Sequence, residues 1–428
     1  MICSVYINPN KLNIEGVMSA TKPVKLGVIS CPGTEKVTTE VTRHLKKQYT
    51  KKYSRLATHI ARKYEMPVED VWRMMYLNED LHSVRLNQNS NFTKYQPPEF
   101  RLPVKFTRFA NGEFKAEINS SVKGMNIFII QDVENHYPIS FNDNSESHIL
   151  SVNDHIFLLF VTMDAVRQAG AASVTLVLPT YPYSRQHKKK GREALTASRF
   201  GQICEFMGAN RIITIDIHSK EIENSFKNLI LENLHGSYQV LLKLKSLVDF
   251  DDPDLVVVSP DTGAVDRNKF FAGNLKKPLA MLYKERDYSK VSQDAGKSNI
   301  TNIRLLGDVK GKTVFMADDM LGTGGTLIMA MRALKGFGAK KIICSISLPI
   351  FSGDAISFFD KAYEEGLFEY IIGTTAVYHE ADLLERDWFV SAPVSDLIAR
   401  SISRLYHERS LSPLLDNSRM IQKLLKKN

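Results

Sequence analysis

TVFMADDMLGTGGTL, residues Thr313–Leu327, combines the features of a phosphate-binding turn in an α/β protein. Its apolar residues predict a buried strand, Thr313–Ala317, which ends in the paired acids Asp318 and Asp319. A turn of glycines and threonines follows this strand. Apolar residues then recur at helical spacing, at Leu327, Ile328, Met331 and Leu334.

The turn suits an anion, and the two acids suit a different group. Glycines let the backbone approach an anion, a helix start supplies free N–H groups, and threonine hydroxyls add donors. Five residues of the turn are candidates for this role: Gly322, Thr323, Gly324, Gly325 and Thr326. Carboxylates repel phosphate, so Asp318 and Asp319 suit ribose hydroxyls or a divalent cation. An ordinary strand-to-helix turn with a solvated acid pair is the alternative, but DD followed by GTGGT is rarer than a glycine-rich turn.

The whole chain has the composition of a globular protein. Its 428 residues, 43% hydrophobic and 24% charged, suffice for two or three domains. No apolar run approaches the roughly 18–20 residues that span a bilayer, and the N-terminus lacks the pattern of a signal peptide. The four cysteines form no CxxC pair, which argues against a metal cluster or a disulfide framework. We therefore expect a cytoplasmic protein without a membrane partner.

The net charge of +9 permits nucleic-acid binding but also suits small polyanions. Basic residues cluster at Lys46–Lys52, His187–Lys190 and Lys423–Lys427. Such runs are usually solvated faces. The middle run differs, because it follows a predicted strand at the sheet edge where α/β proteins bind ligands. We expect small polyanionic ligands and no nucleic acid.

Short apolar runs alternate with helical patterns through most of the chain, which predicts parallel sheets flanked by helices. The expected strands are Val24–Ser30, Asn126–Gln131, Ser173–Leu178, Arg211–Ile215, Leu255–Ser259, Leu279–Tyr283, Thr313–Ala317, Lys341–Leu348 and Tyr370–Ala376.

The chain also repeats itself. A helical pattern that ends at Gly170 and precedes the strand VTLVLP parallels one that ends at Gly338 and precedes IICSISLP. This predicts two copies of one α/β domain, with a further β-strand after Pro393 that packs elsewhere. The expected divisions are an N-terminal extension (1–23), a first domain (24–240), a second domain (241–415) and a basic tail (416–428). Two polar segments, about 50–100 and 134–150, fit poorly and are interpreted as surface insertions.

Four further clusters carry chemistry. In FTRFANGEF, Phe109, Asn111 and Glu113 surround a turn and could hold an adenine ring, although such a pattern by itself more often marks a plain β-turn. In YPYSRQHKKK, Arg185 and Gln186 follow a strand at the ligand-binding edge of the sheet.

The other two clusters also follow predicted strands. His218 and Asp261 end the strands of ITIDIHS and VVVSPDTG and could ligate a cation, although a lone histidine is more often structural. Lys284 and Arg286 stand where the strand LAMLY meets a polar, Gly- and Ser-containing loop. Two cations at this place suit charge neutralisation during phosphoryl transfer.

In this order the motifs resemble the class I ribose-phosphate pyrophosphokinases, also called phosphoribosyl-pyrophosphate synthetases. The matching segments include FANGE, YPYSRQ, REALTAS, ITIDIHS, VVSPDTG, YKER, LLGDVKGK, DDMLGTGGT and IFSGDAI, from about Val24 to about Leu415. The resemblance implies two tandem phosphoribosyltransferase-like domains and transfer of an intact diphosphate from ATP to the 1-hydroxyl of ribose 5-phosphate. It also implies Mg²⁺ as cofactor and a homo-oligomer, a dimer or a hexamer.

The resemblance implies a role for each candidate residue. Phe109, Asn111 and Glu113 would reach into the site of a neighbouring subunit and hold the adenine there. Arg185 and Gln186 would bind the phosphates or the ribose of ATP. His218 and Asp261 would position Mg²⁺. Lys284 and Arg286 would be the catalytic cations, and Arg286 would also touch ribose 5-phosphate. Ribose hydroxyls would bind Asp318 and Asp319, and the 5-phosphate would bind Thr323–Thr326.

Three positions depart from the family pattern. The family usually carries an acid in place of Gly322, commonly an aspartate in place of His187, and a second glycine in place of Ala264. The first departure puts ribose-phosphate affinity in question. Three other functions therefore stay open: a catalytically silent regulatory subunit, a phosphoribosyltransferase, and a nucleic-acid-binding regulator. The retained Lys284 and Arg286 argue against the silent subunit.

Overall fold

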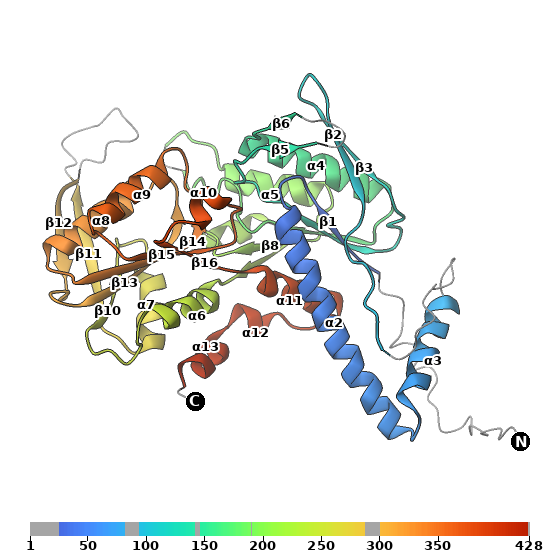
Figure 1. Cartoon of the computed structure of the whole chain (residues 1–428). Coiled ribbons are helices and arrows are strands. Elements are labelled where there is room, and N and C mark those ends of the chain that lie inside the picture. Colours follow the sequence, from blue (N-terminus) through green and yellow to red (C-terminus); the bar gives the residue numbers. More distant parts are fainter. Residues whose placement is uncertain (1–24, 82–93, 142–145, 190, 287–299, 427–428) are drawn as a thin grey trace, which may run out of the picture.

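The computed structural model describes residues 25–81, 94–141, 146–189, 191–286 and 300–426, with the backbone alone for 284–286 and 300–302. Two open sheets with helices on both faces form an N-terminal and a C-terminal half (Figure 1). The predicted α/β class with two tandem phosphoribosyltransferase-like units is confirmed. The predicted domain boundaries stay predictions, and the extension 1–23 lies outside the described residues.

The sheet of the N-terminal half is parallel throughout, in the order β1-β4-β7-β8-β9. Its strands are β1 (Leu26–Ser30), β4 (Asn126–Ile130), β7 (Ser173–Val177), β8 (Arg211–Ile215) and β9 (Ile230–Leu234). The helices α4 (Val152–Gln168) and α5 (Thr196–Phe206) pack on one face. The opposite face is covered by α2 (Glu35–Lys63) and α11 (Ser395–Tyr406).

The second sheet has the order β12-β11-β10-β13-β14-β15-β16, and among these pairs β11 and β12 are antiparallel. Its strands are β10 (Leu255–Ser259), β11 (Leu279–Arg286), β12 (Ile300–Leu306), β13 (Thr313–Leu321), β14 (Lys341–Pro349), β15 (Tyr370–Thr374) and β16 (Phe389–Ala392). The helices α8 (Gly325–Gly336) and α9 (Ala355–Glu364) cover one face. The other face carries α6 (Ser237–Leu247), α7 (Val265–Leu275) and α13 (Ser418–Leu425).

The predicted internal repeat extends to single hydrogen bonds. Gly170, which has a φ of +83°, accepts a bond from Gly124 N–H through its carbonyl oxygen at 2.8 Å. Gly338, which has a φ of +87°, accepts one from Gly311 N–H at the same distance. Positive φ is the conformation in which glycine carries no steric penalty. The same turn therefore precedes a central strand in each half.

Two strand predictions need correction. β13 continues four residues beyond Ala317, because β14 pairs with it as far as Leu321, so Asp318 and Asp319 lie within the strand. The predicted β-strand after Pro393 is wrong, since residues from Ser395 onward form helix α11. Apolar residues there recur at helical spacing. They pack against α2 of the N-terminal half, so the end of the chain returns to the first sheet.

The two presumed insertions have ordered elements. α2 is a helix of 29 residues that projects from the body, with α3 (Val68–Leu81) beside its far end (Figure 1). The segment 134–150 contains the short pair β5 (Ile139–Ser140) and β6 (Ser147–His148). A hairpin of β2 (Val104–Arg108) and β3 (Phe114–Ile118) precedes β4. The short helices are η2 (Lys220–Ser225), α10 (Ala381–Leu384) and α12 (Ser412–Leu415). Within the described residues, no helix has the length and apolar character needed to cross a bilayer.

Candidate active site

The turn between β13 and α8 is built around glycine. Gly324 caps α8 with a φ of +77°, and a Cβ atom there would lie 2.3 Å from Cε2 of the Phe359 ring. Both the conformation and the contact therefore exclude a side chain. Gly322 differs, since its φ is not positive and an added Cβ would meet only Nη1 of Arg185, at 3.7 Å.

The predicted phosphate loop lines one hollow. Gly322, Thr323, Gly324, Gly325 and Thr326 surround it together with Asp318 and Arg185. Thr323, Gly325 and Thr326 are exposed at the start of α8, where backbone N–H groups lack intrahelical partners. Such a helix start attracts anions. The structure therefore brings the five turn residues and Asp318 to one hollow, whereas Asp319 does not line it and the side chain of Arg286 lies outside the described residues.

The acid pair contacts the other half of the molecule. Nδ1–H of His218, just after β8, donates a hydrogen bond to Oδ2 of Asp319 at 2.5 Å. The backbone N–H of Asp319 donates to Oδ1 of Asp318 at 2.9 Å. His187, where the family commonly has aspartate, places its ring 5.3 Å from the ring of His218.

The two acids differ in proton affinity. Burial, and then the charge of Asp319, raise the pKa of Asp318 to about 7. Burial acts in the same direction on Asp319, but the hydrogen bond from His218 and the charge of Arg267 outweigh it and hold the pKa of Asp319 below its usual value. Of the two acids, Asp318 therefore binds a proton more readily, and Asp319 is the better ionised partner for His218.

The ATP candidates fall into two groups. Arg185 and Gln186 come after β7 in the chain. Arg185 lines the hollow. The side-chain oxygen of Gln186 accepts a hydrogen bond from Thr196 Oγ1 at 2.7 Å. The other candidates, Phe109, Asn111 and Glu113, lie exposed at the tip of the β2–β3 hairpin, as a turn closed by Gly112 N–H donating to Phe109 O at 2.9 Å.

Within the described parts of the chain, no hydrogen bond or ion pair joins these three residues to the phosphate loop. Lys284 and Arg286 end β11, but their side chains lie outside the described residues, as does the loop 287–299.

Asp261 occupies the turn after β10. Its Oδ1 accepts hydrogen bonds from the backbone N–H groups of Gly263 and Ala264, at 3.0 and 3.1 Å. Its charge also contributes to the raised pKa of Asp318, so the two acids share one electrostatic environment. In the described part of the chain, no group of three or more His, Cys, Asp or Glu side chains is arranged to hold a metal ion.

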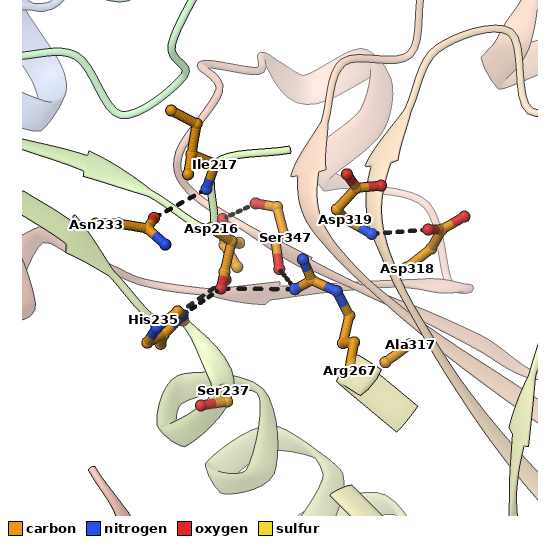
Figure 2. Close-up of polar contacts among 12 residues, drawn as sticks. Asp216, Ile217, Asn233, His235, Ser237, Arg267, Ala317, Asp318, Asp319 and Ser347 are labelled. Atoms are coloured by element: carbon orange, nitrogen blue, oxygen red, sulfur yellow. Dashed lines mark hydrogen bonds and ion pairs between the residues drawn. The ribbon is translucent and has the colours of Figure 1, made fainter. Parts of the chain in front are cut away.

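Sequence reasoning missed a polar network beside this site. Figure 2 shows Asp216, His235, Arg267 and Ser347 joined by hydrogen bonds and ion pairs, with Asp318 and Asp319 close by. Arg267 belongs to the motif VVVSPDTGAVDR. It follows the turn that contains Asp261 and lies in the first turn of the next helix, so its position in the motif could have indicated a role near the site. No sequence pattern linked Arg267 to Asp216.

Comparisons with known proteins show the family of this chain. Residues 100–208 match the model of the N-terminal domain of ribose phosphate pyrophosphokinase, and residues 235–357 match the phosphoribosyl transferase domain. The ribose-phosphate pyrophosphokinase 1 of Lactococcus lactis is 33% identical over 347 residues, 80% of this chain and 98% of that protein. The ribose-phosphate pyrophosphokinase of Corynebacterium ammoniagenes is 30% identical over 349 residues, 80% of this chain and 99% of that protein.

The fold agrees as well. The crystal structure of phosphoribosylpyrophosphate synthetase from Mycobacterium smegmatis aligns with a TM-score of 0.64 and 23% identity, over 90% of this chain and 99% of that one. At this identity the match supports the fold alone.

Proposed function

Since the chain belongs to the ribose-phosphate pyrophosphokinase family, we propose that it transfers the β,γ-diphosphate of ATP to the 1-hydroxyl of ribose 5-phosphate. The products are phosphoribosyl pyrophosphate and AMP. The observation that carries the proposal is the meeting of the two halves at one hollow. Arg185 of the N-terminal half lines the hollow with the phosphate loop and Asp318, and His218 bonds Asp319, the neighbour of Asp318.

Ribose 5-phosphate binds in that hollow. Its 5-phosphate receives hydrogen bonds from the loop Thr323–Thr326, where exposed hydroxyls and free N–H groups meet the positive end of α8. Asp318 and Asp319 bind the ribose hydroxyls. Carboxylate oxygens accept hydrogen bonds from hydroxyls, and Asp319, whose pKa is held below its usual value, is the stronger acceptor of the pair.

ATP approaches from the N-terminal half. Arg185 and Gln186 bind its phosphates or ribose. The exposed hairpin tip with Phe109, Asn111 and Glu113 holds the adenine of a neighbouring subunit, because within the described chain no hydrogen bond or ion pair joins this tip to the phosphate loop of its own chain. A homo-oligomer, at least a dimer, follows from this assignment.

The donor set near the acid pair fits Mg²⁺. This ion usually keeps several waters and binds through one or two carboxylates together with substrate phosphates, so a complete protein cage is not required. Asp261 provides a carboxylate, and His218 retains Nε2 for a ligand while Nδ1–H bonds Asp319. When bound, Mg²⁺ would neutralise charge on the phosphates.

The chemical step is attack of the ribose 1-hydroxyl oxygen on the β-phosphorus of ATP. The bond from this phosphorus to the α-phosphate oxygen breaks, and AMP leaves. Lys284 and Arg286, at the end of β11, stabilise the charge that develops in this transition state.

Three described cysteines, Cys31, Cys204 and Cys344, are buried free thiols, which suits a reducing cytoplasm.

Analysis of the nucleotide product tests the proposal. The purified protein is incubated with Mg²⁺-ATP and ribose 5-phosphate, and we expect AMP and phosphoribosyl pyrophosphate in equal amounts. ADP as product would indicate transfer of a single phosphoryl group and refute the proposal. Binding of both substrates without turnover would instead indicate a silent regulatory subunit.

A further inference from the structure

Asp216 is a buried acid whose partners come from both halves of the molecule. It follows β8 and is 5% exposed. Within the N-terminal half its carboxylate accepts hydrogen bonds from His235 Nδ1–H at 2.8 Å and from the backbone N–H of Gly236 at 3.1 Å. Burial by itself would raise the pKa of Asp216, but the charge of Arg267 and the hydrogen bond from His235 hold that pKa well below its usual value.

The partners from the C-terminal half are Arg267 on α7 and Ser347 on β14. Nη1 of Arg267 lies 3.6 Å from Oδ1 of Asp216 and donates a hydrogen bond to Ser347 Oγ at 2.9 Å. The next residue, Asn268, fixes α7 to β13: its side chain donates to Ala317 O at 2.8 Å and accepts from Ala317 N–H at 2.9 Å. Arg267 is therefore tied to the strand that carries the acid pair.

The backbone at Asp216 directs the chain toward the second half. Asp216 has a φ of +44°, in the left-handed region that aspartate tolerates better than most residues. Such a conformation persists when surrounding contacts fix it. Two residues later, His218 reaches Asp319 (2.5 Å). The Asp216–Arg267 ion pair and the His218–Asp319 hydrogen bond thus cross the same boundary between the halves. Figure 2 shows the ion pair, with Asp318 and Asp319 nearby.

Beside the network lies a cavity of about 380 Å³, lined in part by Asp216, Arg267, Phe270 and Ser347. On this side the network borders open space, whereas the adjacent residues Ile215 and Leu348 belong to one apolar core that joins the two halves. The polar contacts therefore add a directional constraint to a connection that apolar packing also supports.

We propose that Asp216 and Arg267 form an interdomain tie that positions His218 against Asp319 and so aligns ATP with ribose 5-phosphate for transfer. Both are positioning residues, since they act through the contact between His218 and Asp319. The inference rests on the proposed function and adds to it the device that holds the two substrate sites in register. A misplacement of about 1 Å can lower a rate about a hundredfold.

Two substitutions test the tie in the full-length protein. Asp216→Asn keeps the shape and loses the charge, and Arg267→Gln removes the cation. We expect each to lower kcat by about ten- to a hundredfold with KM for ATP and ribose 5-phosphate changed by less than about threefold. The double variant should equal the worse single variant within about threefold, because both changes break one link.

A matched ion pair controls for stability. Arg211 and Glu232 pair within the N-terminal sheet, between β8 and β9, with side chains 23% and 13% exposed. Arg211→Gln should lower Tm to a similar degree as Asp216→Asn and leave kcat per folded molecule near the wild-type value. Equal kcat losses in Arg211→Gln and Asp216→Asn would mean that lost stability alone explains the effect, and this result would overturn the proposal.

Two further outcomes separate the possible failures. If Arg267 acts only through its charge on Asp319, Arg267→Gln loses activity while Asp216→Asn keeps it, and the tie is refuted. His218→Ala tests the proposed site independently. Loss of activity in His218→Ala with wild-type kcat in both tie variants refutes the tie alone, whereas full activity in His218→Ala refutes the assignment of His218.

Discussion

Gly322 offers a sharp test of the ribose-phosphate site, because the family resemblance places an acid where this chain has glycine. The structure leaves room for one. The φ of Gly322 is not positive, and an added Cβ would meet only Arg185 Nη1, at an ordinary contact distance of 3.7 Å. An aspartate at this position would line the same hollow as Asp318. Its carboxylate could then accept a hydrogen bond from a ribose hydroxyl.

One such hydrogen bond is worth about 1–2 kcal/mol. Gly322→Asp should therefore lower KM for ribose 5-phosphate by about five- to thirtyfold. Arg185 is exposed, and a pair with the new carboxylate contributes about 0–1 kcal/mol, so KM for ATP should stay within about fivefold. Steady-state kinetics with each substrate varied in turn measure both values.

Two matched variants identify the cause. Gly322→Ala adds the Cβ and restricts the loop without an acceptor, and it should change KM for ribose 5-phosphate by less than about threefold. Gly322→Asn adds a neutral acceptor of the same shape and should recover part of the gain. An unchanged or raised KM in Gly322→Asp would mean that the loop has adapted to glycine, and the reasoning would be wrong.

Three other expectations follow. Lys284→Ala should lower kcat and kcat/KM together by about two to four decades, and near-normal kcat would remove the residue from catalysis. Gly324→Ala should destabilise the protein by about 2–4 kcal/mol in denaturant titrations, because its Cβ meets the Phe359 ring in a left-handed backbone; unchanged stability contradicts this account. Burial lowers the pKa of His379 to about 4 in the folded protein, from about 6.5 in the unfolded chain. The unfolded state therefore takes up the proton first, so the stability present above about pH 6.5 is lost as the pH falls toward 4. His379→Gln should remove up to about 3 kcal/mol of the difference in unfolding free energy between those pH values; an identical pH profile refutes it.

The sequence predicted what local pattern determines. Strands buried on both faces appear as continuous apolar runs, so β4, β8 and β10 were found within a residue of their bounds. The turns after Gly170 and Gly338 repeat because each half needs the same left-handed residue. The short strand β9 was missed, since ILENL alternates weakly and its pairing with β8 decides its structure.

The phosphate loop was predictable for the same reason. Glycines, hydroxyls and a helix start are adjacent in the chain, so one stretch specifies one hollow. The full length of β13 could not be predicted, because pairing with β14 holds its last residues in the strand. Asp318 and Asp319, which lie among these residues, have no strand signal of their own. Helix α11 was mistaken for a strand, although its apolar residues have helical spacing and bury against α2.

Contacts between the halves had no such signal. His218 and Asp319 are both polar residues beside strand ends, and nothing in either motif sets their separation at 2.5 Å. Their distance depends on how two separately patterned sheets dock, and the polar groups at that boundary decide it. Asp216 illustrates the point. In the sequence it is an acid two residues before His218, with no further signal. In the fold it is buried, accepts a hydrogen bond from His235 of its own half and pairs with Arg267 of the other. A buried charge is tolerated only when it is paired and hydrogen-bonded, and here part of that set comes from each half. The residue that joins the two substrate sites is therefore recognisable only once both halves are in place.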